Sequence, residues 1–420
     1  MFNDRISDYF EGVAAKYLKP VDADPDSSNQ HEIGGLVKAG FKKYLGAPDK
    51  NQEFRYKAKQ VYFTDEALAP DICESTVTWY DCRRKKPLRK PEFRLYYNSN
   101  SVTDLFTAGD FFLVAKMRDD TLLMVCAPAG STIESQLKIL FGLHNIKTTF
   151  IRGEMDAVEL LLPLRLMLES LGVEVTKVEV GDDVWLQRLI TSFGGESFPK
   201  TSDFSLYARN SLESPVDPIV FPDQAIVEWM DHEEKLFRIY ERHLVRQKLR
   251  VGFGEDGEDV DDFVNYSLSV QNRRKSRVGH AFERHLSYIF ESHGIRFERG
   301  GAKGFSTENS KKPDFLFPGF SEYRDLEYPE NKLFMLGAKT TCKDRWRQVL
   351  SEAKRISEKH LVTLEAAISE GQTSEMASSG LRLVVPKSMH STYSKSQAEW
   401  LIALSEFIEL IKQAEGTGTA

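Results

Sequence analysis

Three carboxylates and one lysine in the C-terminal half of the chain have types and spacing that suit one kind of chemistry. Asp314 precedes a short apolar run, Lys339 ends another, and Glu352 follows Lys339 after twelve intervening residues. Glu283 lies upstream, beside the apolar stripe of a predicted helix. Hydrolysis of a phosphodiester needs a divalent cation to neutralise the phosphate, and a lysine can orient the attacking water and stabilise developing charge.

The proposed cation is Mg²⁺, with Asp314 and Glu352 as its ligands. Magnesium prefers oxygen ligands and keeps several waters, so two carboxylates and a phosphate oxygen suit it. Taken singly, each of these charges is more often structural than catalytic. Their order and spacing together favour a nuclease.

The elements that must position these residues form an α/β pattern. Apolar runs at 315–317 and 333–338 predict strands whose ends hold Asp314 and Lys339. We predict that the next helix carries Glu352 and that an upstream helix carries Glu283. The sequence therefore predicts a C-terminal α/β domain around a mixed sheet. Its remaining elements are expected as helices at 278–292, 345–364 and 398–411 and a strand at 381–385.

The first third of the chain is β-rich. Short apolar runs bounded by Asp, Gly, Pro and Asn predict a barrel or sandwich. Helical spacing follows at 131–143 and 157–171. The strands are expected at 60–64, 75–80, 93–97, 111–117 and 122–127.

A stretch rich in Gly, Ser and Pro separates the two parts. We predict an N-terminal domain over 1–190, a linker over 191–218 and a catalytic domain over 219–420. A long amphipathic helix at 223–249 and an acidic turn at 252–262 open the last part.

Composition excludes several classes of protein. The 420 residues are 41% hydrophobic and 28% charged, which is typical of globular proteins. No apolar run is long enough for a membrane span, and the start lacks a signal core, so we expect a cytoplasmic protein. Four cysteines without a CxxC pair exclude a disulfide framework and argue against a structural zinc site. The net charge of −7 argues against a non-specific polyanion binder, yet basic patches and an acidic metal site cancel in such a total.

The C-terminal half resembles the catalytic domain of EcoRII-type restriction endonucleases. This family is a branch of the PD-(D/E)XK nucleases in which the second acidic residue has moved to the helix after the second strand. Asp314, Lys339 and Glu352 match its pattern. The resemblance implies that Glu283 is the additional upstream glutamate and Tyr323 a tyrosine near the active site. It extends over about 200–412 and rests on the segments 271–277, 313–318, 339–348 and 383–386.

Two groups of residues are expected to contact DNA in this domain. Lys343 and Arg345 can donate to guanine and Asp344 can accept from cytosine, although a solvated helix start explains the same segment. The resemblance implies that it reads the CC/GG part of a five-base-pair site. Phosphate contact is the natural role of a basic cluster before Glu283. That cluster is Arg273, Arg274, Lys275 and Arg277.

The N-terminal part resembles the family's effector DNA-binding domain, a B3-like pseudobarrel, through the segments 28–34 and 94–99. The family's basic loop follows the second segment, but residues 101–109 contain no Lys or Arg here. Residues 83–94 hold seven basic residues against one acidic and could replace that loop, or form a solvated hairpin. The expected DNA contacts are His31, Arg83, Arg84, Lys85, Lys86 and Arg94.

Together these features predict a Mg²⁺-dependent, sequence-specific double-stranded DNA endonuclease of a restriction–modification system. By the resemblance, its target is a short palindrome like CCWGG, and the N-terminal domain binds effector DNA and inhibits the catalytic domain. A palindromic target predicts a homodimer, and a cognate DNA methyltransferase would protect the same site. The alternatives are a nuclease of this fold that acts on modified or mismatched DNA, and a non-enzymatic DNA-binding regulator.

Overall fold

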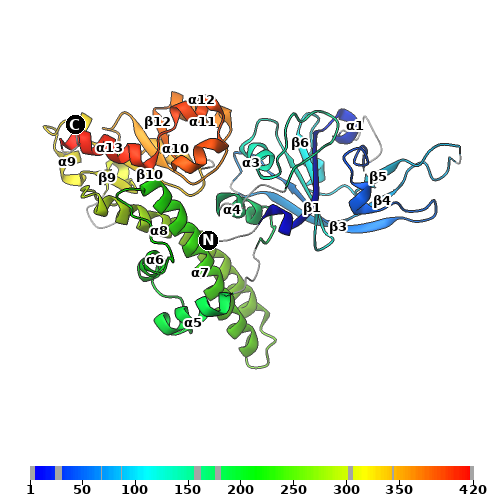
Figure 1. The fold of residues 1–420 in the computed structure, drawn as a ribbon, viewed down its shortest axis with the longest axis horizontal. Helices are drawn as coiled ribbons and strands as arrows, with labels where there is room; N and C mark the ends of the chain where they lie inside the picture. Colours follow the sequence, from blue (N-terminus) through cyan, green and yellow to red (C-terminus); the bar gives the residue numbers. More distant parts are fainter. Residues whose placement is uncertain are drawn as a thin grey trace. The chain divides into compact units, whose positions relative to one another are not determined.

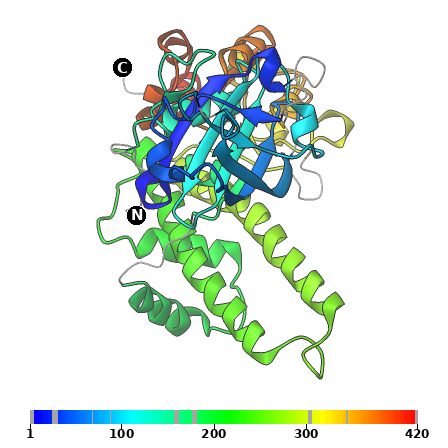
Figure 2. The ribbon, with the colours of Figure 1, turned by 90° about the vertical axis from the view of Figure 1, so that its right-hand side faces the viewer.

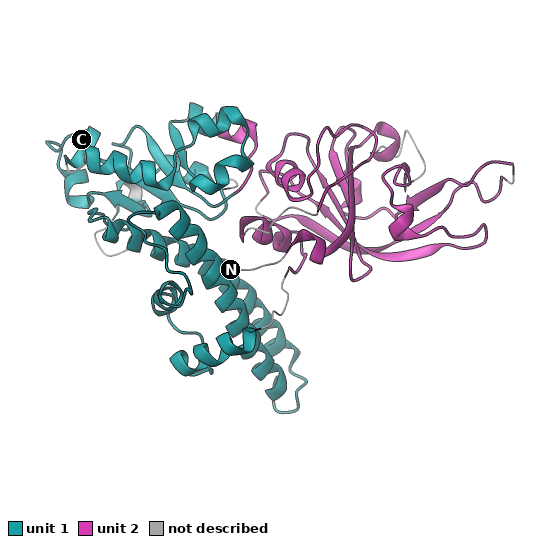
Figure 3. Cartoon of the chain, viewed as in Figure 1, with its two compact units in different colours: residues 1–2, 176–365, 374–420 teal, residues 3–175, 366–373 magenta. Residues whose placement is uncertain are grey.

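The computed structural model describes residues 5–23, 31–67, 69–86, 88–155, 162–175, 181–300, 306–342 and 345–416. The chain forms two compact units (Figure 3). Unit 1 contains residues 1–2, 176–365 and 374–420, and unit 2 contains residues 3–175 and 366–373. Within the described ranges, none of the helices has the length and apolar character that a membrane crossing requires.

Unit 2 is built on one eight-stranded sheet in the order β2-β5-β4-β3-β7-β6-β1-β8. The pairing of β3 with β7 is parallel and the other described pairings are antiparallel. The β-rich prediction is confirmed, and the sheet curves into a half-barrel (Figure 1). The strands are β1 (Phe10–Tyr17), β2 (Glu32–Ile33), β3 (Phe54–Tyr62), β4 (Asp71–Asp81), β5 (Phe93–Tyr96), β6 (Phe111–Met117), β7 (Leu122–Ala127) and β8 (Ile151–Arg152).

The core of unit 2 lies against its central strands. Every residue of β7 is buried, so its continuous apolar run marks a strand covered on both faces. Trp79 and Phe112 are fully buried in the main cluster on one face. Ser131 caps α3 by accepting a hydrogen bond from Glu134 N. The helices of this unit are α1 (Pro20–Ala23), α2 (Lys42–Leu45), α3 (Thr132–Leu140) and α4 (Leu162–Ser170).

Unit 1 begins with four helices, of which two fall in or beside the predicted linker. α5 (Asp182–Phe193) and α6 (Thr201–Asn210) pack on α7 (Pro222–Val251) through a shared apolar cluster. Residues 191–218 are therefore part of unit 1, and the boundary lies between 175 and 176. The Gly, Ser and Pro residues there form the turns around α6, whose apolar face is buried.

α7 and α8 (Val260–Ser292) run side by side as a long hairpin, which Figures 1 and 2 both show. α8 begins well before the predicted start at 278. Asp259 caps it by accepting a hydrogen bond from Asp262 N, so the acidic turn ends as a helix start.

A four-stranded mixed sheet in the order β12-β11-β10-β9 forms the rest of unit 1. β9 is antiparallel to β10, while β10, β11 and β12 are parallel. Helices flank this sheet, which confirms the predicted fold class (Figure 1). The strands are β9 (Phe315–Phe317), β10 (Phe334–Ala338), β11 (Lys359–Val362) and β12 (Leu381–Val384), and the helices are α9 (Phe320–Arg324), α10 (Trp346–Leu350), α11 (Glu370–Ser378), α12 (Lys395–Trp400) and α13 (Leu404–Glu415).

Two further predicted helices, besides the one expected at 278–292, are wrong in their extent. The helix expected at 345–364 ends with α10 at Leu350, and β11 occupies 359–362. Ala353 between them has a φ of +47°, which a continuing helix does not allow. The helix expected at 398–411 is divided because Ile402 bridges to Val384 beside the sheet. In both places strand pairing overrides helical periodicity.

Candidate active site and nucleic-acid interface

Asp314 and Lys339 meet at one end of the sheet. The antiparallel register pairs Leu336 with Phe315, so the start of β9 lies beside the end of β10. Lys339 Nζ donates to Asp314 Oδ2 at 2.6 Å. Ala338 N donates to the same oxygen at 2.7 Å, which fixes the carboxylate against the strand.

Glu352 lies in the turn after α10, and not within a helix, and is near enough to Asp314 and Lys339 for both charges to act on its carboxyl. Burial and the charge on Asp314 raise the pKa of Glu352 to about 7, against the opposing effect of Lys339. The two carboxylates thus repel each other in a partly desolvated site. A divalent cation between them would relieve this repulsion.

Tyr323, expected near the active site, holds the segment that follows Glu352. Its hydroxyl donates to Glu308 Oε1 at 2.6 Å and accepts from Arg355 N at 3.2 Å. Glu308 Oε2 accepts from Lys354 N at 3.3 Å. Burial and the Glu308 carboxylate raise the pKa of Tyr323 to about 12, so the phenol stays protonated as the donor. In these contacts Tyr323 and Glu308 hold the backbone that follows Glu352.

Arg355 completes this support. Its Nη1 donates to the carbonyl of Tyr323 at 2.8 Å and its Nε to Glu330 Oε1 at 3.4 Å. The guanidinium also donates to the carbonyl oxygens of Asp325 and Tyr328. It therefore ties the turn after Glu352 to the loop after α9. Sequence reasoning missed Glu308 and Arg355 because neither belongs to a spacing pattern.

Glu283 projects from α8 and forms an ion pair with Arg299 Nη2. Arg299 also experiences the charge of Asp314, and its guanidinium carbon lies 5.6 Å from the centre of the Phe315 ring. Sequence reasoning missed Arg299. A glycine pair after it, Gly300 and Gly301, was the available signal of a close backbone approach.

The described residues offer two carboxylates for a metal ion. Among them, no group of three or more His, Cys, Asp or Glu side chains gathers as a metal site. Asp314 and Glu352 match a Mg²⁺ ion that completes its coordination with water and phosphate oxygens. The raised pKa of Glu352 is the observation that favours a cation there.

The predicted base-reading segment is described only at its end. Lys343 and Asp344 lie outside the described residues. Arg345 is exposed directly before α10, and its N–H donates to the Cys342 carbonyl at 2.9 Å. Cys342 is buried, and its N–H donates to the Glu365 carboxylate. The backbone on one side of the segment is thus anchored, while the Arg345 side chain is open to solvent.

The basic cluster on α8 divides into structural and exposed residues. Arg277 is only 6% exposed and pairs with Glu233, so in the folded chain its guanidinium is not open to a phosphate. Arg274 forms an ion pair with Glu241 at 2.6 Å.

The other two members of the cluster differ from Arg277. Lys275 is exposed and suited to phosphate contact, and Arg273 is half-buried over the ring of Phe198. The helical spacing of this cluster could not separate its buried member from its exposed ones.

In unit 2 several predicted DNA contacts are already paired. Arg94 bridges Glu32 and Glu92 at 2.9 Å each, and Arg83 pairs with Glu92. His31 is half-buried, with its ring centre 5.5 Å from that of Tyr97. Lys85 and Lys86 are exposed on the hairpin between β4 and β5.

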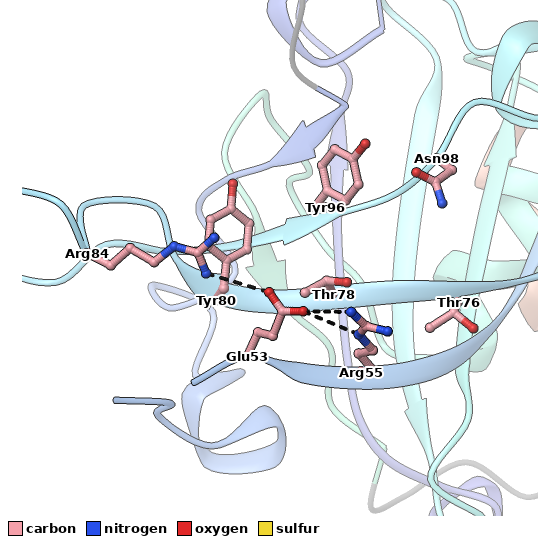
Figure 4. A pocket seen from close by; sticks show the side chains of 8 residues that line it. All are labelled: Glu53, Arg55, Thr76, Thr78, Tyr80, Arg84, Tyr96 and Asn98. Carbon is pink, nitrogen blue, oxygen red and sulfur yellow. Dashed lines mark hydrogen bonds and ion pairs between the residues drawn. The ribbon is translucent and has the colours of Figure 1, made fainter. Parts of the chain in front are cut away.

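A groove of about 450 Å³ lies on the sheet face next to this hairpin (Figure 4). The Glu53 carboxylate lies 2.9 Å from Arg55 Nη2 and 3.6 Å from Arg84 Nη1. Arg84 also lies over the Tyr80 ring, at 4.8 Å from its centre. The lining offers two guanidinium groups, aromatic rings and hydroxyl and amide groups: Glu53, Arg55, Thr76, Thr78, Tyr80, Arg84, Tyr96 and Asn98.

Comparison with known proteins supports the resemblance over the C-terminal half. Residues 237–408 match the protein family described as EcoRII C terminal. The type II restriction enzyme EcoRII of Escherichia coli is 42% identical over 216 residues, which are 50% of this chain and 50% of that enzyme. The type II restriction enzyme SsoII of Shigella sonnei is 35% identical over 115 residues, or 25% of this chain and 36% of that enzyme.

Solved structures give weaker similarities. Metal-depleted Ecl18kI in complex with uncleaved, modified DNA has a TM-score of 0.44 at 17% identity, over 58% of this chain and 88% of that one. The complex of restriction endonuclease PspGI with substrate DNA has a TM-score of 0.40 at 16% identity, over 58% and 98%.

The predicted resemblance to EcoRII-type enzymes is therefore confirmed in the region that contains Asp314, Lys339 and Glu352. The chain spans half the length of EcoRII in this match and 36% of the length of SsoII.

Proposed function

We propose that this chain is a Mg²⁺-dependent type II endonuclease that cuts double-stranded DNA at a specific site. The observation that carries the proposal is the meeting of Asp314, Lys339 and Glu352 at one end of the sheet, within the region that matches the EcoRII C-terminal family. A DNA-binding regulator has no need for such a set.

The residues divide the hydrolysis between them. Asp314 and Glu352 would hold a divalent cation, which would neutralise phosphate charge and make a water more acidic. Lys339 Nζ can orient that water and stabilise charge on the phosphorus-bound oxygens. The water gives up a proton to solvent as its oxygen bonds to phosphorus, the bond to the leaving oxygen breaks, and the leaving oxygen takes up a proton from solvent.

Recognition is assigned to the segment 343–345, with a target like CCWGG. Neighbouring C·G pairs satisfy two cationic donors and one carboxylate acceptor in the major groove. A palindromic target calls for a homodimer. The remaining assignments are a cognate DNA methyltransferase as functional partner and action in the cytoplasm, where the DNA is.

The test is incubation of the purified chain and Mg²⁺ with unmethylated plasmid, and in parallel with methylated plasmid and a mismatched duplex, followed by sequencing of the ends. Defined ends at one short palindrome support the proposal. Ends that appear only on methylated or mismatched DNA favour the alternative nuclease. Intact plasmid in Mg²⁺, together with site-specific binding, favours a regulator.

Unit 2 is assigned to binding of effector DNA, with inhibition of cleavage until that DNA binds. The hairpin lysines and the groove beside them support DNA contact, since cationic and hydroxyl groups are the usual phosphate partners. Arg83 and Arg94 already pair with glutamates, and Glu53 pairs with Arg84. A DNA phosphate must therefore compete with these carboxylates for the arginines.

Inhibition is tested with a fragment of residues 181–420. It starts before α5 because Leu189 and Phe204 share one buried cluster, which a start at 200 would open. We expect this fragment to cleave a single-site plasmid at least as fast as the full chain. Slower cleavage by a folded fragment would contradict inhibition by unit 2.

A further inference from the structure

The ion pair of Glu283 with Arg299 lies at the edge of the candidate active site and has no role in the mechanism above. Arg299 follows α8 in a segment that extends the sheet. Glu298 and Leu316 exchange two backbone hydrogen bonds of 2.9 Å, and Gly300 N donates to the Pro313 carbonyl at 3.0 Å. These bonds place Arg299 alongside the start of β9, next to Asp314.

Gly300 makes this close approach possible. A Cβ atom on Gly300 would lie 2.7 Å from the backbone of Lys312 and from the Pro313 oxygen. Any other residue would push the two backbones apart. The position of Arg299 relative to Asp314 is therefore built into the backbone and does not depend on a flexible loop contact.

Two carboxylates of the candidate active site, Glu283 and Asp314, act on the Arg299 guanidinium. The guanidinium pairs with Glu283 and lies in the field of Asp314, with its face towards Phe315. Its buried Nε has no hydrogen-bond partner among the described residues. Arg209 Nε is in the same situation, so the argument for Arg299 rests on its neighbours Glu283 and Asp314.

The same ion pair decides how many metal ions the carboxylates can hold. Many phosphodiesterases use two cations to stabilise the attacking and the leaving oxygen. Here Glu283 is paired with a guanidinium, and the described residues contain no group of three carboxylates at one point. Asp314 and Glu352 remain for a single ion.

We propose that Arg299 takes the place of a second metal ion: it neutralises Glu283 and presents a fixed positive charge to the scissile phosphate. The inference rests on the proposed nuclease function and assigns the chain a one-metal site with a further phosphate-binding residue. Arginine suits this role because its planar fork binds phosphate oxygens and stays charged at all working pH values.

The first experiment counts ions on the full chain. Mn²⁺ is titrated into the protein, and the free ion is measured by electron paramagnetic resonance. We expect one bound ion per wild-type chain and two for Arg299→Ala, because Glu283 is released as a ligand. The double variant Arg299→Ala, Glu283→Gln should return to one ion. Two ions on the wild-type chain, or one on Arg299→Ala, would overturn the proposal.

The second experiment follows cleavage against Mg²⁺ concentration. Arg299→Ala should lose about 100-fold in rate and become sigmoidal in Mg²⁺. Arg299→Lys, which keeps a charge but not the fork, should bind one ion and lose rate. Arg296→Ala is the matched control, since Arg296 pairs with Glu322 outside the site. Cleavage by Arg299→Ala within threefold of wild type would refute the assignment.

The two experiments also separate this inference from the proposed function. A wild-type chain that cleaves no DNA would contradict the nuclease function, and with it the role of Arg299 at a phosphate. Normal wild-type cleavage with an unchanged ion count in Arg299→Ala would refute the Arg299 inference alone.

Discussion

Lys339 Nζ and Asp314 Oδ2 are 2.6 Å apart, so the lysine ammonium at the end of β10 is held by the carboxylate at the start of β9. Each side chain fixes the other before any substrate is present. The backbone N–H of Ala338, which donates to the same oxygen at 2.7 Å, leaves the second carboxylate oxygen of Asp314 for a metal ion. Positioning by two strand ends is stiffer than positioning by loops.

The first prediction concerns this pair. Asp314→Asn should abolish detectable cleavage because the metal loses a charged ligand, and Lys339→Ala should slow cleavage by about 10²–10³-fold. Specific DNA binding without metal should stay within a few-fold of wild type, because the base-reading segment lies elsewhere. Cleavage rates and gel-shift affinities of both variants test this, and near-normal cleavage by either would refute the active-site assignment.

The second prediction is a pH dependence of metal affinity. Burial and the charge on Asp314 raise the pKa of Glu352 to about 7, so below that pH a proton competes with the metal. The apparent dissociation constant for Mn²⁺ should fall roughly tenfold between pH 6 and pH 8. Glu352→Gln should bind weakly with little dependence on pH in this range. A wild-type affinity that is flat from pH 6 to 8 would contradict the assignment of Glu352.

The same raised pKa predicts that, without metal, the folded state loses stability as the pH rises. Because the folded-state pKa lies above the ordinary value, folding favours the protonated carboxyl, and that contribution is lost as pH rises through about 7. In the absence of metal, Glu352→Gln should therefore be more stable than wild type at pH 8, with a smaller difference at pH 5. Thermal unfolding at the two pH values measures it. Equal melting temperatures of the two proteins at pH 8 would show that the ionised Glu352 carboxylate does not destabilise the fold.

The third prediction concerns the support behind Glu352. Arg355→Ala releases the turn after Glu352 from the loop after α9, so Mn²⁺ affinity should fall by roughly 10-fold or more. The midpoint of its pH dependence should move down, because a looser Glu352 is better hydrated. Arg355→Lys should restore affinity in part. Glu358→Gln is the control, being exposed and outside the network; an equal loss in both variants would indicate a general effect.

The sequence could predict this site in part, and the limits have physical causes. Asp314 and Lys339 were predictable because apolar runs mark β9 and β10, and strand ends must carry them. The role of Glu352 was predictable from its spacing to Lys339, but its location in a turn was not, since the sequence after α10 has helical periodicity. The turn there is held by Tyr323, which lies far from Glu352 in sequence and contacts Arg355 just after it.

Buried charges were the other limit. Arg277 reads as part of a basic surface cluster, yet it lies in a buried network with Glu233 and Ser205, whose hydroxyl donates to that glutamate at 3.1 Å. His285 also belongs to this network, because its Nε2 lies 2.9 Å from the Glu233 carboxylate. Only tertiary packing of α6, α7 and α8 decides which of these charges faces inward. Residues 191–218 fall within unit 1 for the same reason, because turn composition does not reveal whether the helix between is packed.

The fourth prediction concerns sequence specificity. Arg345 is exposed at the start of α10, beside an anchored Cys342, so its guanidinium can reach base edges without refolding the backbone. Arg345→Ala should lose about 1–3 kcal/mol of discrimination at one base pair of each half-site. Lys275→Ala, an exposed phosphate-type residue, should weaken binding equally on all sequences and reduce its salt dependence. Cleavage of a random-sequence library by wild type and both variants measures the two effects. A wild-type consensus without CC and GG at its ends would refute the base-reading assignment of residues 343–345 and leave the nuclease assignment standing.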